Sequence, residues 1–308
     1  MMLKAREVLF LCSLLLPVIP GMASAQDMSK YFTVMHPEKF SIDWTGFYRS
    51  INEATARVRQ QFPHHLDISF GSHSKQALDL YLPTGEVSDA PVFLFLHGGG
   101  FREGDRAHYG SIALPFLKNG IITAVASYRL MGEGYHFPSQ SNDVKNAVKW
   151  LYENISSYGG NASALFVGGH SAGAILSADI GVDRAWMPRM GIPKEALRGI
   201  IPVSGPYDLR NKGKTTYESA YAPTAELKVL ASPILHINDP MPAALVACGS
   251  KEKYEESSSE FSRALWAAGV KGEYLNLQGQ GHNDTALSLA DENSLLFKRA
   301  LALIQENQ

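Results

Sequence analysis

A serine flanked by glycines forms the strongest chemical motif of this chain, Gly-His-Ser-Ala-Gly at residues 169–173. It directly follows the apolar run 164–167 and directly precedes 174–178, a segment that can continue as a helix. A G-x-S-x-G sequence between a strand and a helix holds its serine on a sharp, strained turn and exposes the hydroxyl at the carboxyl end of a sheet. The pattern therefore predicts that Ser171 is a nucleophile.

A serine hydroxyl is a weak nucleophile at neutral pH, so it needs a general base, and the base needs an orienting carboxylate. In this strand–turn–helix arrangement the chain order is serine, acid, histidine, and only His236 and His282 follow Ser171. His236 lies among apolar residues, whereas His282 lies in a glycine-rich loop after the strand-like run 274–277. We predict that His282 is the base and that His236 is a structural or lid residue.

The orienting acid has four candidates. Glu252 is the fourth residue after a strand-like apolar run that ends at Cys248, and it precedes the base by 30 residues, which is room for one helix and one strand. Glu255 and Glu256 are close competitors that a solvated helix start would also explain. Asp208, after the preceding strand, is the fourth candidate. We favour Glu252 and leave the other three open.

Acyl transfer also creates an oxyanion, and removing one of the N–H donors that stabilise it costs about 2.7–4 kcal/mol. The sequence His-Gly-Gly-Gly-Phe at 97–101 ends an apolar strand-like run. Glycines allow the backbone to turn its N–H groups inward with no side chain in the way. We predict Gly99, Gly100 and Ala172 as the donors, with Gly98 as the substitute for one of the glycines. The histidine of this loop is then a scaffold residue.

The elements that must position these groups alternate between two patterns from about residue 66 onward. Nearly continuous apolar runs are typical of strands buried on both faces, and they occur at 92–96, 121–126, 164–167, 199–204 and 243–248. Two earlier runs, 66–70 and 77–82, alternate like half-exposed strands at a sheet edge. Helical spacing of apolar residues recurs at 144–151, 261–268 and 297–304. This alternation predicts an α/β fold with a mostly parallel sheet of about eight strands, covered on both faces.

The first 25 residues have a different character. A positive start with Lys4 and Arg6 is followed by an apolar run to about Pro20 and by Ala-Ser-Ala at 23–25. This is the pattern of a secretory signal, and the apolar run is short for a membrane span, which needs about 20 residues. We expect an exported protein, periplasmic or secreted, with no stable membrane insertion after cleavage. An uncleaved N-terminal anchor is the alternative.

The remainder, 26–308, is then one domain. Residues 26–65 are expected to form an N-terminal helical segment. The stretch 205–240 interrupts the rhythm with Gly, Pro, Lys and Tyr, and we expect it to pass over the sheet as small lid elements.

Composition excludes several function classes. The formal net charge is -2, so no basic excess exists to drive nucleic-acid binding. The sequence contains no P-loop, no dinucleotide fingerprint and no H-E-x-x-H or clustered Cys/His pattern, so we predict no cofactor and no metal. Cys248 lies inside an apolar run and is expected to be a core residue. No sequence pattern fixes an oligomeric state.

The glycine loop at 97–101 followed by the serine motif at 169–173 resembles the hormone-sensitive-lipase-like and feruloyl-type esterases of the α/β-hydrolase superfamily. The segment 78–83 and Asp143 are similar to that group too, and the segment from 281 to 291 is similar to bacterial kynurenine formamidases. The resemblance spans residues 66–308. It implies a three-layer αβα sandwich and acyl hydrolysis without a metal.

Two positions depart from those relatives. Formamidases usually carry His-Gly-Gly-aromatic-Trp where this chain has Gly100 and Phe101, and most relatives have aspartate as the acid where this chain offers Glu252.

Three functions compete on these grounds. The first is an exported serine carboxylesterase that acts through an acyl-enzyme on small or medium esters, including aryl esters. The second is an arylformamidase or other amidase, which the C-terminal similarity favours and the export signal disfavours. The third is a noncatalytic binding protein on a hydrolase scaffold; such proteins typically lack one member of the triad, whereas all three residue types are present here.

Overall fold

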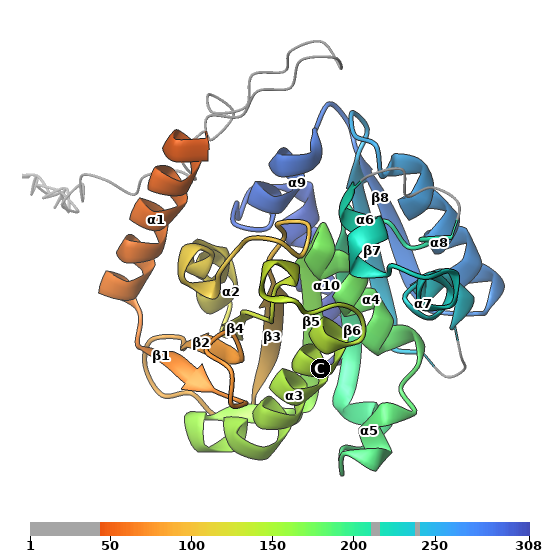
Figure 1. Cartoon of the computed structure of the whole chain (residues 1–308). Helices are drawn as coiled ribbons and strands as arrows, with labels where there is room; N and C mark the ends of the chain where they lie inside the picture. Colours follow the sequence, from red (N-terminus) through yellow and green to blue (C-terminus); the bar gives the residue numbers. More distant parts are fainter. Residues whose placement is uncertain (1–43, 211–215, 238–240) are drawn as a thin grey trace, which may run out of the picture.

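The computed structural model describes residues 44–210, 216–237 and 241–308, and eight strands in this part of the chain form one sheet (Figure 1). Their bounds are β1 His64–Ser69, β2 Ala77–Tyr81, β3 Ala90–Leu96, β4 Ile122–Ala126, β5 Gly160–His170, β6 Leu197–Val203, β7 Ala243–Gly249 and β8 Gly272–Leu277. The strand order is β1-β2-β4-β3-β5-β6-β7-β8. β2 is antiparallel to both of its neighbours, and all other neighbouring pairs are parallel. The predicted mostly parallel sheet is confirmed.

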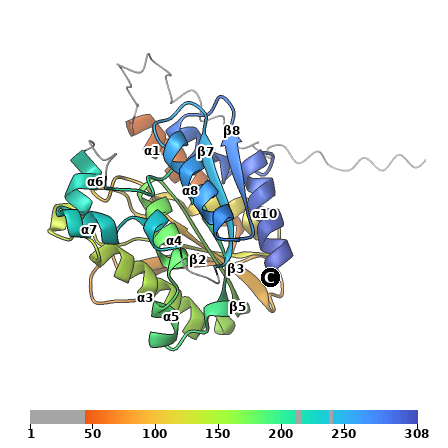
Figure 2. The same ribbon diagram turned by 90° about the vertical axis from the view of Figure 1, so that its right-hand side faces the viewer.

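Helices cover both faces of this sheet. Their bounds are α1 Trp44–Gln61, α2 Ala113–Leu117, α3 Ser139–Asn154, α4 Ala172–Val182, α5 Trp186–Arg189, α6 Thr216–Tyr221, α7 Ala225–Leu230, α8 Glu255–Ala267, α9 His282–Ser288 and α10 Leu295–Asn307. Figure 2 shows α3 and α4 on one side of the sheet and α10 on the other. The arrangement is the expected three-layer αβα sandwich, because each face of a sheet that carries apolar side chains must be covered.

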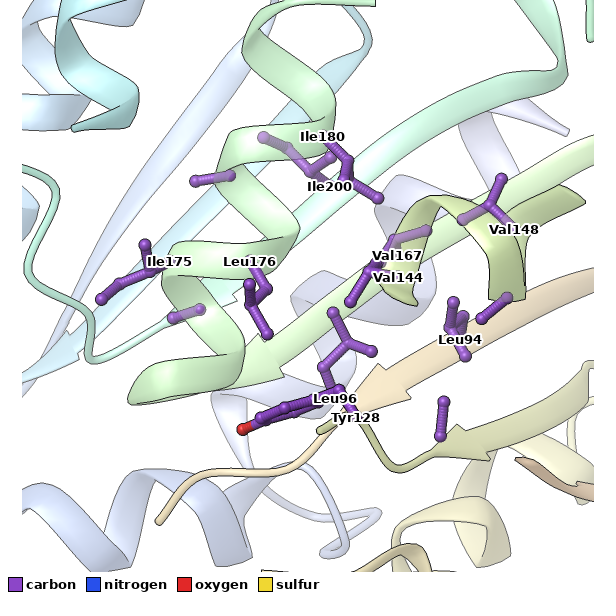
Figure 3. Close-up of a cluster of buried hydrophobic side chains, with 14 of the residues drawn as sticks. Leu94, Leu96, Tyr128, Val144, Val148, Val167, Ile175, Leu176, Ile180 and Ile200 are labelled. Carbon is purple, nitrogen blue, oxygen red and sulfur yellow. The ribbon is translucent and has the colours of Figure 1, made fainter. Parts of the chain in front are cut away.

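The central strand β3 shows why its residues are apolar at nearly every position. Leu94 and Leu96 point into the core beneath α3 and α4, where side chains of both helices meet those of the strands (Figure 3). Phe93 and Phe95 point to the opposite core, in which Phe116 stacks on Phe93 with ring centroids 4.5 Å apart. Successive side chains of a strand face opposite ways, so a strand buried on both faces must be apolar throughout.

The edge of the sheet differs from the expectation in two respects. β1 begins at His64, so the last two residues of the predicted helical segment 26–65 belong to a strand. β2 was expected to be half exposed, and this is wrong, because all five of its residues are buried. Its polar residue Asp79 is accommodated by ion pairs, since Arg59 and Arg106 each lie 3.1 Å from its carboxylate. The alternation of polar and apolar residues in β2 therefore results from a buried ionic network and not from an exposed face of the strand.

In the described part of the stretch 205–240, the short helices α6 and α7 follow β6 and precede β7 along the chain. α6 is held against the glycine loop, since the ring of Tyr221 stacks on that of Phe101 with centroids 3.8 Å apart. The predicted export signal, 1–25, lies outside the described residues. Across the described ranges, no helix has the length and apolar character required to cross a membrane.

Candidate active site

Ser171 makes the turn between β5 and α4 alone, since the strand ends at His170 and the helix begins at Ala172. Its backbone has φ 57° and ψ -112°, a conformation that costs a residue with a side chain about 1–3 kcal/mol. The Ser171 N–H donates to the carbonyl of Val203 at 2.9 Å, which ties the turn to β6. The strained strand-to-helix turn required by the motif is therefore present.

The glycines on either side of Ser171 allow this turn to pack closely. A Cβ on Gly173 would lie 2.1 Å from the backbone oxygen of Leu96, and one on Gly169 would lie 2.5 Å from the Gly173 carbonyl. Both obstacles are backbone atoms, which cannot rotate away as a side chain can. The two glycines are required by the contact between the turn and β3.

We expect Gly173→Ala to lower the free energy of unfolding by about 3 kcal/mol, because overpacking against backbone forces the elements apart. Chemical denaturation of the variant measures this. Gly132→Ala is the control, since a Cβ there meets no atom within 4 Å. If the Gly173 variant and the wild type have the same free energy of unfolding, the turn accepts the added methyl group without loss of stability.

His282 brings its imidazole against the serine. Its Nε2 lies 3.0 Å from Ser171 Oγ, and its Nδ1 lies 2.5 Å from Glu252 Oε2. Because an ionised carboxylate can only accept hydrogen bonds, Nδ1 carries the proton and Nε2 is free to accept one from the serine. His282 was expected in a loop, whereas it is the first residue of α9, immediately after the glycine-rich turn that follows β8.

Glu252 lies in the turn after β7, and its side chain is only 2% exposed. Its Oε1 accepts hydrogen bonds from the Gly249 N–H at 2.8 Å, from Ser204 Oγ at 2.5 Å and from Cys248 Sγ at 3.1 Å. Burial favours the neutral acid, but hydrogen bonds from His282, Ser204 and Gly249 outweigh it and lower the pKa of Glu252 to about 2. The carboxylate is therefore ionised at neutral pH.

The other candidate acids point elsewhere. Asp208 forms an ion pair with Arg210 at 2.8 Å, and Glu255 accepts a hydrogen bond from the Asn276 amide at 3.0 Å. Glu256 is an exposed residue in the first turn of α8. Of the four carboxylates, the structure places Glu252 against the imidazole.

The second histidine is separate from this group, because His236 Nε2 is bonded to the carbonyl of Val229 at 2.9 Å.

The glycine loop lies directly over the serine. A Cβ on Gly98 would lie 3.3 Å from Ser171 Cβ and 3.0 Å from His170 Nδ1. Gly99 and Gly100 both have positive φ, 116° and 59°, which turns the backbone as only glycine does readily. Within the described ranges, the N–H groups of these two glycines donate no hydrogen bond. The loop thus passes beside the serine turn at Gly98, and two of its backbone N–H groups have no hydrogen-bond acceptor among the described residues.

His97 supports this loop from below. It is fully buried, and its ring stacks on that of Tyr128 with centroids 4.4 Å apart. The Tyr128 hydroxyl donates to the His97 carbonyl at 2.7 Å. Burial lowers the pKa of His97 to about 4, so the ring is neutral. These contacts fit the scaffold role predicted for it.

Three side chains that the sequence analysis did not single out complete the surroundings of His282. Thr285 Oγ1 and His170 Nε2 each lie 2.7 Å from the His282 carbonyl oxygen, and Ser204 Oγ lies 2.7 Å from Thr285 Oγ1. The sequence offered one indication of Ser204, which is its place just after β6, since Glu252 likewise comes shortly after β7. Among the described residues, no group of three or more His, Cys, Asp or Glu side chains is placed to hold a metal ion.

Curated proteins with similar sequences are hydrolases. The chain is 26% identical over 262 residues to a kynurenine formamidase of Danio rerio, covering 83% of this chain and 87% of that protein. It is 25% identical over 297 residues to esterase LipC of Mycobacterium tuberculosis, covering 88% of this chain and 72% of that protein. A probable isoprenylcysteine alpha-carbonyl methylesterase of Arabidopsis thaliana is 26% identical over 261 residues, covering 77% of this chain and 62% of that protein.

Solved structures of esterases share the fold. A truncated carbohydrate esterase from gut microbiota superposes with a TM-score of 0.71 at 20% identity, over 80% of this chain and 96% of that chain. A hyperthermophilic esterase from the archaeon Pyrobaculum calidifontis has a TM-score of 0.66 at 18% identity, over 86% and 92%. The profile of the BD-FAE family matches residues 78–265, which is more than half of the chain. The chain belongs to this BD-FAE family of α/β-hydrolase esterases, and it is accordingly a hydrolase.

Proposed function

We propose that this protein is a serine carboxylesterase in which Ser171, His282 and Glu252 form the catalytic triad. The observation that carries the proposal is the continuous contact from Ser171 Oγ to His282 Nε2 at 3.0 Å and from His282 Nδ1 to Glu252 Oε2 at 2.5 Å. A nucleophile bonded to a base that is itself oriented by a carboxylate is the arrangement that nucleophilic acyl transfer needs.

In the first half-reaction Ser171 Oγ attacks the ester carbonyl carbon while its proton passes to His282 Nε2. The carbonyl π electrons move to oxygen and form a tetrahedral oxyanion. Glu252 stabilises the imidazolium that results, because its carboxylate faces Nδ1–H. Collapse of the intermediate breaks the bond to the leaving alcohol, which takes the proton from Nε2, and an acyl-serine remains.

Water completes the cycle by the same route. His282 Nε2 removes a proton from the attacking water, a second oxyanion forms, and the Ser171 oxygen leaves with that proton. The products are a carboxylic acid and the free enzyme, so no redox partner is required.

Backbone N–H groups of Gly99, Gly100 and Ala172 are the proposed donors to both oxyanions. Positive φ at the two glycines and the position of Ala172 at the start of α4 support this assignment, because the first N–H groups of a helix have no partner within it.

The proposal is tested with p-nitrophenyl esters of two to eight acyl carbons and with a fluorophosphonate probe. We expect saturable hydrolysis of the shorter esters and a covalent adduct on the peptide that contains Ser171, located by mass spectrometry. Absence of both turnover and adduct would refute the esterase and favour a binding protein on this scaffold.

Replacing Glu252 with glutamine is expected to reduce kcat by about 10³- to 10⁴-fold, because the imidazole loses its orienting charge while Ser171 remains in place. Initial rates on p-nitrophenyl acetate measure the effect. Glu255→Gln is the matched control and should leave the rate unchanged. A larger loss in the Glu255 variant would assign the acid to that residue instead.

The same variant tests the depressed pKa of Glu252. A carboxylate whose pKa falls on folding stabilises the protein above its unfolded pKa, and this contribution is lost as the pH drops through the folded value. The wild type's advantage over Glu252→Gln in free energy of unfolding should therefore be full above about pH 4.5 and shrink toward pH 2. Denaturant titrations at pH 7, 4 and 3 check this, and a constant difference would contradict it.

Formamide hydrolysis is the second candidate, favoured by the similarity to a kynurenine formamidase along 83% of the chain. The same triad would cleave a C–N bond, with His282 protonating the leaving amine. Comparing kcat/KM for N-formylkynurenine and p-nitrophenyl acetate decides between them, and a strong preference for the formamide would replace the esterase assignment.

We further propose that the protein is exported, on the strength of the residues at 1–25 alone. N-terminal sequencing of the protein recovered from a bacterial periplasm should begin at Gln26. An intact Met1 in the cytoplasmic fraction would refute export.

A further inference from the structure

Ser204 is a strained and fully buried residue at the carboxyl end of β6. Its φ is 59°, and its exposed fraction is 0%. Its N–H donates to the carbonyl of Ala247 on β7 at 2.8 Å, which holds the backbone between two strands. Glycine would adopt this φ without strain, so the cost of a side chain here calls for a reason.

The hydroxyl of Ser204 lies 2.5 Å from Glu252 Oε1, the carboxylate oxygen that does not face His282. A second hydroxyl continues the chain of contacts, because Thr285 Oγ1 lies 2.7 Å from Ser204 Oγ. Thr285 is also fully buried, and it contacts the His282 carbonyl oxygen at 2.7 Å. The contacts thus close a ring that runs from the His282 imidazole through Glu252, Ser204 and Thr285 to the His282 backbone.

The direction of each hydrogen bond in this ring follows from the number of protons that its members can donate. The ionised Glu252 accepts only, so Ser204 must use its single proton toward Glu252. Ser204 Oγ then accepts from Thr285, whose one proton is shared between Ser204 Oγ and the His282 carbonyl. That carbonyl also accepts from His170 Nε2 at 2.7 Å, so it keeps a donor when Thr285 turns to Ser204.

We infer that Ser204 and Thr285 form a hydroxyl pair that positions the carboxylate of Glu252 for His282 during ester hydrolysis. Both are positioning residues, since their hydroxyls contact Glu252, each other and the His282 carbonyl, and they act on the substrate only through Glu252 and His282. The inference rests on the proposed esterase function.

Without the hydroxyl pair, the donors that the described part of the chain leaves to Glu252 Oε1 would be the Gly249 N–H and the Cys248 thiol. A thiol is a weak donor, and the carboxylate would be held at one oxygen by a single strong bond. Rotation about the last side-chain bond would then weaken the contact with His282 Nδ1. The loss should appear in kcat, because the charge on the imidazole develops only in the transition state.

Ser204→Gly separates this role from a purely structural one. Glycine adopts the positive φ of this position without strain, so the midpoint of thermal unfolding should stay close to that of the wild type. We expect kcat on p-nitrophenyl acetate to fall by about 10- to 100-fold, the range set by losing one hydrogen bond to a charged group. KM should change by less than about twofold, because substrate binding does not involve this residue.

Thr285 supplies an independent pair of variants. Thr285→Val keeps the shape and removes the hydroxyl, so kcat should fall by about 3- to 10-fold, since its bond to Ser204 is between neutral groups. Thr285→Ser keeps the hydroxyl and should restore kcat to near the wild-type value. Ser262→Ala is the matched control: this serine is buried, and its hydroxyl donates to the Ser258 carbonyl at 2.8 Å.

Wild type and Ser171→Ala are measured in the same assay. If the wild type is active and Ser171→Ala is not, an unchanged kcat in both Ser204→Gly and Thr285→Val overturns the hydroxyl pair alone. A fall in kcat that is matched by a fall in thermal stability, with no rescue by Thr285→Ser, also overturns it. An inactive wild type overturns the proposed function, and this inference with it.

Discussion

Ser171→Ala is expected to lower kcat on short p-nitrophenyl esters by about 10⁴- to 10⁶-fold. The hydroxyl is the only group in the proposed mechanism that bonds covalently to the substrate. In the variant a water molecule would have to attack instead, and it would not be held beside His282 Nε2 as the hydroxyl is, at 3.0 Å. KM should change little, because the glycine loop and the rest of the site remain. The fluorophosphonate adduct should disappear together with the activity.

Two further variants make this result specific. Ser177 is fully buried in α4, the helix that follows Ser171, and its hydroxyl donates to the Ala174 carbonyl at 3.0 Å, so Ser177→Ala should keep wild-type turnover. Ser171→Gly should be inactive yet more stable than the wild type by about 1–2 kcal/mol, because glycine removes the strain of φ 57°. Substantial turnover by Ser171→Ala would mean that another residue is the nucleophile.

His282→Gln is expected to lower kcat to a similar extent, about 10⁴- to 10⁶-fold. Glutamine approximates the reach of the imidazole, but its amide cannot take up the serine proton and return it to the leaving alcohol. The loss should exceed that of Glu252→Gln, because the carboxylate only orients and stabilises the base.

His236→Gln is the control for this variant, since His236 is the other histidine that follows the serine in the chain. Its Nε2 contacts the Val229 carbonyl, so the replacement should leave kcat unchanged. If His236→Gln were inactive and His282→Gln active, the base would be reassigned. Full activity of both variants would show that neither histidine acts as the general base.

The periodicity of the sequence predicted most of the sheet, because burial on both faces leaves a local pattern. Apolar runs identified β3, β4 and β7 closely. β5 proved longer than the run 164–167, since it extends from Gly160 to His170. Strand ends that carry glycine or polar residues are paired by tertiary contacts and leave no apolar signal.

Alternation was a poorer guide at the sheet edge. The sequence around Asp79 has the pattern of a strand with one exposed face, yet Asp79 is 1% exposed. Two arginines from distant segments, Arg59 and Arg106, neutralise it. A one-dimensional pattern records that a residue is polar, but it does not record whether a partner will bury it.

By itself the sequence determined the fold class, the strained turn at Ser171 and the choice of His282 over His236 as the candidate base. These rest on local spacing and chain order, which a folded chain preserves. Only the tertiary structure decided which of four carboxylates faces the imidazole, and that Ser204 and Thr285 lie behind Glu252. Those contacts join the segments after β6, β7 and β8, and a difference of one residue along a turn redirects a side chain completely. Which side chains meet depends on how the folded strands pack together, and the number of residues between two positions in the sequence does not give the distance between them in space.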